Sequence, residues 1–237
     1  MKKPRRTAER NAQGAAPLAM GRVSALKNVR IFYEKIGRMK FISHLDMIRF
    51  MARLVKKSGI PVWYTEGFNQ HIYLNFALPL SLGFESLYEV LELRLTSDSF
   101  SCEECLEALK NVAPPDIRFI EVKEPVMDMK DISFAEYSLE FENTELKAKL
   151  EEFLQRDSII CEKKGKKGKI KEVDLIPKIK NFSFEDNKLT LRVAAGNNDT
   201  LNPSLVMDTF FKETQILPVY YKVTRTKILN NSQELFC

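Results

Sequence analysis

The chain has 237 residues, which is enough for one large domain or two small ones that each bury a core. Hydrophobic residues make up 44% and charged residues 29%, which is ordinary for a soluble globular protein. No apolar run reaches the roughly 18 to 20 residues that span a bilayer, and no signal-peptide stretch follows the basic N-terminus. We therefore expect a cytoplasmic protein with no membrane partner.

Basic residues concentrate at the N-terminus. Residues 1–30 contain eight Lys or Arg and a single acidic residue, Glu9, so the rest of the chain is slightly acidic although the net charge is +5. Residues 1–27 show no helical or strand periodicity, which predicts a basic disordered leader. Such a leader could bind RNA or an acidic partner. Equally, it could result from a start site placed too far upstream.

Residues 28–125 are predicted to form a first β-α-β-β-α-β unit. Residues 29–34 alternate as a strand, Ser43 caps the helix that follows, and Gly59 ends it. The predicted buried stripe of this helix is Leu45, Ile48, Ala52 and Val55. The further elements expected are a strand beginning at 62–65 and resuming at 72–78, a strand at 88–95, a helix at 102–111 and a strand at 117–122.

The pattern repeats in residues 133–230, after a connection near residues 125–133. The elements expected there are a strand at 135–142, a helix at 144–155, extended segments at 159–162, 176–184 and 188–194, a helix from Asn202 to Phe211 and a strand at 219–228. The predicted fold class is therefore α+β, with two tandem ferredoxin-like (β-α-β-β-α-β) units and antiparallel sheets.

Four cysteines are too few and too scattered for a disulfide framework. Cys102 and Cys105 form a C-x-x-C pair early in a helical pattern, and no second pair completes a zinc site. We interpret both as structural thiols and expect neither a metal site nor a cofactor.

Two blocks of sequence resemble a known family. The first comprises residues 38–46, residues 61–69 with His71, and residues 76–80 with Gly83; the second comprises residues 171–175, Pro177, Ile179 and Asn202-Pro203. Together they resemble a radical-SAM-linked bacterial family of unknown function (domain of unknown function 2344). The resemblance implies a companion of a cobalamin-type radical-SAM protein, and gene neighbours in that family suggest work on RNA or ribosomes. The cluster motif C-x-x-x-C-x-x-C is absent from this chain.

The two histidines of the chain fall in the first block. His44 lies in the first turn of a predicted helix, and His71 ends a loop that also contains Gly67. If the helix start and the loop converge, they form one polar substrate-binding cluster that suits a metal, a phosphate or acid–base chemistry. The members of that cluster are Ser43, His44, Asp46, Glu66, Asn69 and His71. Helix capping and hydrogen bonds to loop carbonyls are the structural alternative.

Basic and aromatic residues flank these positions. Arg49 and Arg53 lie four apart on one face of the first helix, with Lys56 and Lys57 extending a basic stripe that suits successive phosphates. Aromatic residues near the loop, Phe68 among them, could stack on single-stranded bases. A solvated helix face and core aromatics are the alternatives.

A lysine-rich segment lies between two predicted strands of the second unit. It packs six lysines into nine residues, Lys163, Lys164, Lys166, Lys167, Lys169 and Lys171, with two glycines between them. We predict a flexible loop that attracts nucleic-acid phosphates, or one that only increases solubility.

Three functions remain open from the sequence. The first is an accessory binding module that presents a substrate, RNA among the candidates, to a radical-SAM partner. The second is an RNA-processing or RNA-modifying enzyme that uses His44 and His71, an idea based on fold analogy alone. The third is a protein–protein adaptor that binds no nucleic acid.

Overall fold

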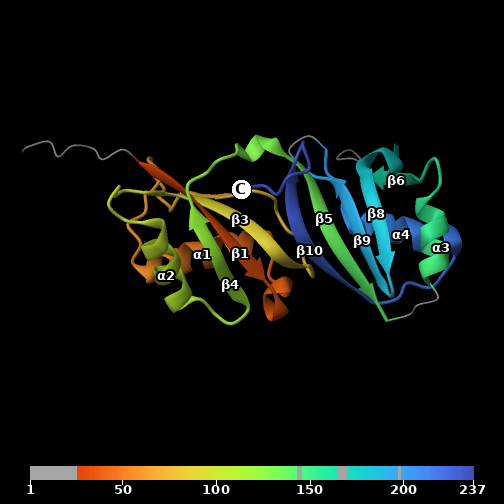
Figure 1. Ribbon diagram of the computed structural model, residues 1–237, viewed down its shortest axis with the longest axis horizontal. Coiled ribbons are helices and arrows are strands. Elements are labelled where there is room, and N and C mark those ends of the chain that lie inside the picture. The colour runs from red at the N-terminus through yellow and green to blue at the C-terminus, as the bar shows by residue number, and fades with distance from the viewer. Residues whose placement is uncertain (1–25, 143–145, 165–169, 197–198) are drawn as a thin grey trace, which may run out of the picture.

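The computed structural model describes residues 26–142, 146–164, 170–196 and 199–237. Their fold is mixed α+β, with a mainly antiparallel eight-stranded sheet and four α-helices within these ranges (Figure 1). The strand order along the sheet is β4-β1-β3-β10-β5-β9-β8, and β2 pairs with β3 outside this path. Lys27, the last residue of the predicted leader, is already the first residue of β1, and residues 1–25 of the leader lie outside the described residues.

The first half of the molecule has the element order β-α-β-β-α-β. Its elements are β1 (Lys27–Lys35), η1 (Gly37–Phe41), α1 (His44–Ser58), β2 (Leu74–Phe76), β3 (Glu85–Leu95), α2 (Cys102–Val112) and β4 (Ile117–Lys123). The strands lie in the order β4-β1-β3-β2, and each neighbouring pair is antiparallel. The strand predicted at residues 62–65 is wrong, because this stretch makes only isolated bridges from Val62 to Leu95 and from Tyr64 to Ile72.

Helix α1 has the ends that the sequence predicts. The Ser43 hydroxyl accepts a hydrogen bond from the Asp46 N–H at 3.2 Å, and Gly59 ends the helix with φ of 75°. The predicted buried stripe is rotated, however, because Leu45 is 56% exposed. The residues of α1 that are buried are Met47, Met51, Leu54 and Val55. The helix has two apolar rows. The row that contains Met47 and Met51, which we call the methionine row, faces the sheet.

The second half repeats the strand order with an insertion. Its elements are β5 (Ile132–Phe141), α3 (Leu146–Leu154), β6 (Ile160–Lys164), β7 (Ile170–Asp174), η3 (Ile176–Lys178), β8 (Ile179–Glu185), β9 (Lys188–Ala194), α4 (Pro203–Thr214) and β10 (Tyr221–Asn230). Strands β10-β5-β9-β8 form its part of the main sheet. The extended segment predicted at 159–162 belongs instead to a separate two-stranded sheet, β6 with β7, which is inserted between α3 and β8.

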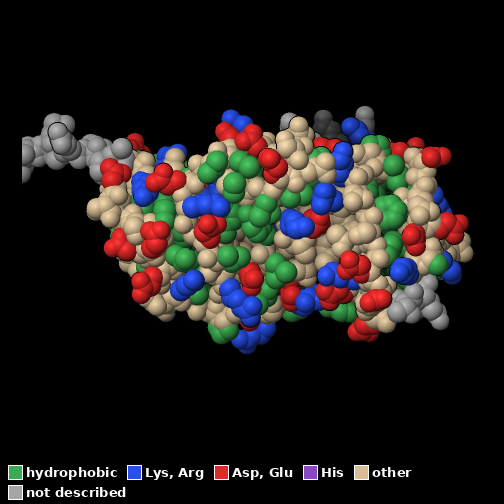
Figure 2. Space-filling view, viewed as in Figure 1, with side chains coloured by type: hydrophobic (Ala, Val, Ile, Leu, Met, Phe, Trp, Pro, Cys, Tyr) green, Lys and Arg blue, Asp and Glu red, His purple; other side chains and the backbone are tan. Residues whose placement is uncertain are grey.

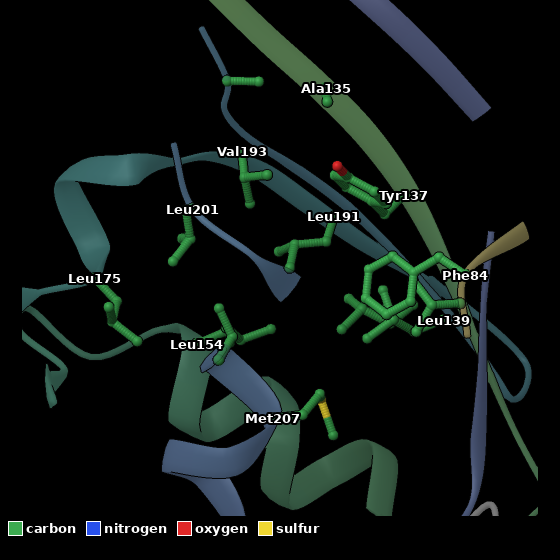
Figure 3. Packing of buried hydrophobic residues seen from close by; sticks show 14 of the residues in the cluster. Phe84, Ala135, Tyr137, Leu139, Leu154, Leu175, Leu191, Val193, Leu201 and Met207 are labelled. Atoms are coloured by element: carbon green, nitrogen blue, oxygen red, sulfur yellow. The ribbon is translucent and has the colours of Figure 1, made fainter. Parts of the chain in front are cut away.

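The two halves share one continuous sheet. Strand β10 runs parallel to the start of β3, where Thr224 and Arg225 face Glu85 and Ser86. One apolar core lies under α1 and α2. A larger core lies under α3 and α4 and includes Phe84 from the first half, which packs edge-on against Tyr137 (Figure 3). The loop that precedes β3 therefore fastens the halves together.

The opposite face of the first half is covered by two connecting segments. The fully buried Arg30 binds Glu92, donates to the Met127 carbonyl at 2.6 Å and lies 4.4 Å from the Phe236 ring. The connection to β5, which includes η2 (Met129–Asp131), and residues 231–237 are held here. Figure 2 shows that this face of the molecule mixes basic and acidic side chains around hydrophobic ones, so it is not a uniformly basic surface.

Candidate functional site

The outer side of helix α1 carries a row of exposed cations. Arg49, Arg53, Lys56 and Lys57 are all exposed, and together we call them the basic ridge. Because the methionine row faces the sheet, these side chains point to solvent. Arg49 is partly neutralised by Asp46, with 3.2 Å between Nη1 and Oδ1. The spacing of the basic ridge suits contacts with successive phosphates. The alternative, a helix face that only meets solvent, would have the same residues.

A short hairpin after α1 presents an aromatic side chain to solvent. Residues 66–71, which we call the Phe68 loop, connect Tyr64 to Ile72, and these two residues form a β-bridge. The Thr65 N–H donates to the His71 carbonyl at 2.8 Å, which closes the loop. Phe68 is fully exposed at its tip, and Glu66 and Asn69 are also exposed. A fully exposed Phe on a closed loop has no role in the core.

Arg94 and two aromatic rings fix the base of this hairpin. The Arg94 guanidinium lies 4.3 Å from the Tyr73 ring and 5.2 Å from the Trp63 ring. The Trp63 N–H also donates to the Arg94 carbonyl at 2.8 Å. Trp63 and Tyr73 are half-buried and lie in neither apolar core, and both rings are already in contact with Arg94.

The turn geometry of the Phe68 loop depends on Gly67 and His71. Gly67 has φ of 118°, a conformation that side-chain-bearing residues rarely adopt. The His71 Nδ1 lies 3.1 Å from both Thr65 Oγ1 and the Asn69 carbonyl, so this imidazole holds the loop closed.

His44 occupies a different environment. Its ring packs edge-on against Phe76, with 5.3 Å between the centroids. It lines a cavity of about 10 Å³ together with Tyr33, Lys35 and Glu89. Partial burial lowers the pKa of His44 from its usual 6.5, which favours the neutral imidazole. We call this space the junction cavity.

Charged side chains are buried behind the junction cavity. Arg225 of β10 is fully buried and binds Glu89 of β3 and, at 2.8 Å, the Leu78 carbonyl. Lys35 of β1 is 3% exposed, and its ammonium donates a long hydrogen bond to the Ile42 carbonyl at 3.4 Å. Burial lowers the pKa of the Lys35 ammonium. Sequence reasoning missed these residues, although a charge at an inward position of an otherwise apolar strand such as β3 was a usable signal.

The two histidines have different surroundings. His44 contacts Phe76, whereas the His71 ring lies beside Thr65 and Asn69. No hydrogen bond, ion pair or ring contact of the described residues joins Ser43, His44 or Asp46 to the Phe68 loop. Whether the polar cluster predicted from the sequence forms and binds a substrate stays a prediction.

The lysine-rich segment is described only in part. Lys163 and Lys164 end β6 and Lys171 lies in β7, where Lys163 faces Lys171 across the hairpin. The other three lysines, Lys166, Lys167 and Lys169, lie outside the described residues. The backbone therefore places part of the segment on a hairpin beside the main sheet, and its binding role stays a prediction.

The C-x-x-C pair has the surroundings of structural thiols. Cys105 is buried in the first core, and burial raises the pKa of its thiol to about 12. Cys102, half-buried at the start of α2, also has a raised pKa because of burial. No group of three or more metal-ligating side chains occurs in the part of the chain that the structure describes.

These features belong to a mixed α+β protein. A family described as an uncharacterized protein conserved in bacteria, DUF2344, matches residues 28–203, and the chain belongs to this family. No curated protein matches the chain. Among the described residues, no helix has the length and apolar character to cross a membrane.

Solved structures offer only distant likenesses. A Cbf5-Nop10-Gar1 complex is similar over 84% of this chain and 48% of its own, so the chain spans about half of that relative, with 11% identity and a TM-score of 0.42. A putative glycine cleavage system transcriptional repressor has 16% identity over 88% of this chain and 100% of its own, with a TM-score of 0.27. An unknown protein from Galdieria sulphuraria has 9% identity over 84% of this chain and 98% of its own, also with a TM-score of 0.27.

Proposed function

We propose that the protein is an accessory binding module that holds single-stranded RNA through the Phe68 loop and the basic ridge of α1. The observation that carries the proposal is the fully exposed Phe68 ring on a rigidly closed loop. A phenyl ring that no other side chain covers offers its face to a ligand. Bases have two aromatic faces and stack on such rings with little regard to sequence.

The position of the basic ridge supports RNA as that partner. The ridge ends at Lys57, and Trp63 at the base of the hairpin follows six residues later, after Gly59 has ended the helix. Cations that track the backbone beside a stacking aromatic are the usual composition of single-strand binding sites. Residues 31–237 together have a slight negative charge, so the basic ridge is a local concentration of positive charge.

We further propose that a cobalamin-type radical-SAM protein is the partner to which this module presents its RNA. The proposal rests on the resemblance of residues 38–46 and 61–69 to the radical-SAM-linked family. Two tandem ferredoxin-like units are the fold that we assign, since strand orders β4-β1-β3-β2 and β10-β5-β9-β8 with covering helices fit that arrangement. We favour binding over catalysis because the two histidines have separate surroundings.

The experiment is a fluorescence-anisotropy titration of a labelled single-stranded RNA with wild type, Phe68→Ala and Leu217→Ala. Leu217 is a matched control, because it is 84% exposed and lies in the second half. Loss of one stacked base should weaken binding by about 1–3 kcal/mol, which is roughly 5- to 150-fold, for Phe68→Ala only.

Equal affinities for the two variants would refute the role of Phe68. If wild type binds no RNA at low salt but retains a protein partner at high salt, the adaptor function replaces this proposal. Circular dichroism of both variants controls for folding.

A further inference from the structure

The junction cavity lies where α1 begins and where the two halves of the sheet meet. Its wall includes Tyr33 and Lys35 of β1, His44 of α1 and Glu89 of β3. The volume, about 10 Å³, is roughly the space that one water-sized atom needs. His44 is only half-buried, so the cavity reaches the surface beside the first turn of α1.

Positive charge exceeds negative charge around this cavity. Lys35 and Arg225 are buried cations, and Glu89 is the one carboxylate among the residues described above that binds either of them. An ammonium has three donors, and that of Lys35 has one long contact. The Nε and Nη1 atoms of Arg225 have no hydrogen-bond partner. Buried cations without matching anions are unfavourable, so this arrangement calls for an anion.

The start of helix α1 adds positive electrostatic potential beside the cavity. Its first N–H groups have no carbonyl partner within the helix, and the helix dipole places partial positive charge there. Asp46 lies in the same turn, but it is 56% exposed in its side chain and is bound by Ser43 and Arg49. Glu89 is likewise held by Arg225. Glu89 also stabilises the charged form of Lys35, so one buried carboxylate serves two buried cations.

We propose that the junction cavity is a phosphate-binding site, in which one phosphate oxygen enters beside the Lys35 ammonium and the remaining oxygens meet the first turn of α1 and His44. A phosphate monoester supplies the charge and the several acceptor oxygens that these donors lack. The small volume admits one oxygen and leaves the rest of the ligand outside. The phosphate comes either from a free ion or from the end of an RNA strand, and the RNA source alone rests on the proposed function.

The test uses the full chain with inorganic phosphate as the probe. Equilibrium dialysis at constant ionic strength, with chloride in place of phosphate as the reference, measures binding to wild type, Lys35→Met and Lys110→Met. Lys110 is exposed at the end of α2, away from both candidate sites, and is the matched control. We expect wild type and Lys110→Met to bind alike and Lys35→Met to bind about tenfold more weakly, the effect of one charge-assisted hydrogen bond.

Folding is measured on the same samples by thermal unfolding. Because methionine replaces an unmatched buried cation by an apolar chain of similar length, the melting temperature of Lys35→Met without phosphate should be unchanged or higher. Phosphate should raise the melting temperature of wild type but not that of Lys35→Met.

A second arm separates the two sources of phosphate. Two RNA oligonucleotides of one sequence, with and without a 5′-phosphate, are titrated against wild type and Lys35→Met. Tighter binding of the phosphorylated strand that disappears in Lys35→Met supports a strand end, whereas equal binding of both strands with positive dialysis supports a free ion. Dialysis that shows no preference for phosphate over chloride, together with equal binding of both strands, would overturn the proposal. Binding of the unphosphorylated strand would still support the role of Phe68.

Discussion

The two halves of the molecule have the same strand order. The core under α3 and α4 is apolar, whereas charged side chains are buried where the two halves meet. The first half and its border with β10 bury Lys35, Glu89 and Arg225. Under α3 and α4 of the second half lies a chain of aromatic contacts, in which Phe153 packs on Phe210 at 5.4 Å. Apolar packing of this kind stabilises a domain without desolvating ions. The comparison indicates that the core under α3 and α4 mainly supplies stability, whereas the border between β3 and β10 has a costlier interior beside the junction cavity.

The largest effect on stability should come from the aromatic core of the second half. Phe153 is fully buried, so Phe153→Ala removes its packing and leaves a cavity. We expect a loss of about 3–5 kcal/mol in the free energy of unfolding, measured by urea denaturation followed by circular dichroism. Leu217→Ala, at an 84% exposed position, should change it by less than about 0.5 kcal/mol. Similar losses for both would show that the core does not lie here.

Removal of the buried carboxylate at the junction should have the next largest effect. Glu89→Gln leaves Arg225 without its charged partner, and we expect a loss of about 3 kcal/mol in the free energy of unfolding. The double variant Glu89→Leu with Arg225→Met should recover most of that loss, since no buried ion of this pair remains. A double variant less stable than the single one would mean that the pair itself stabilises the fold. Glu121→Gln, at a surface ion pair with Lys123, is the control.

A smaller effect should appear as a dependence of stability on pH. The pKa of His44 lies below 6.5 in the folded protein, so the unfolded chain binds this proton more readily. Stability that is present above pH 6.5 should therefore fall as the pH decreases towards the lowered pKa of His44. The pKa values of Asp46, Glu136 and Asp174 are lowered too, but these carboxylates act only below about pH 4.

Urea denaturation at pH 7 and pH 5 measures this effect. His44→Gln should flatten the profile. An unchanged slope in His44→Gln would assign the titration to other groups.

Local chemistry explains which parts of the fold could be predicted. Ser43, Gly59 and Asn202 define helix ends through their own side chains or backbone conformation, and the structure has helix ends at these positions. The inward residues predicted for α3, such as Leu150 and Phe153, are buried because only one apolar row exists on that helix. On α1 two rows were available, and contact with the sheet decided between them.

The remaining features depend on tertiary pairing. The contact of His44 with Phe76 depends on how β2 packs beside α1, which no local pattern specifies. Lys35, Glu89 and Arg225 come from three strands far apart in sequence, so neither the ion pair of Glu89 with Arg225 nor the cavity that Lys35 and Glu89 line could be derived from spacing. The sequence also did not distinguish Phe68 from its aromatic neighbours. In the structure Trp63 and Tyr73 contact Arg94, whereas Phe68 is fully exposed.

The most direct test of the account is the salt dependence of RNA binding, compared between the two halves. Anisotropy titrations from low to moderate salt are made with wild type, with Arg53, Lys56 and Lys57 changed to Gln, and with the six lysines of residues 163–171 changed to Gln. Each lost phosphate contact should reduce the slope of log affinity against log salt by roughly 0.7, so the ridge variant should lose about two units of slope. A ridge variant with the slope and affinity of wild type, or a wild type that binds no RNA at low salt, would contradict the account.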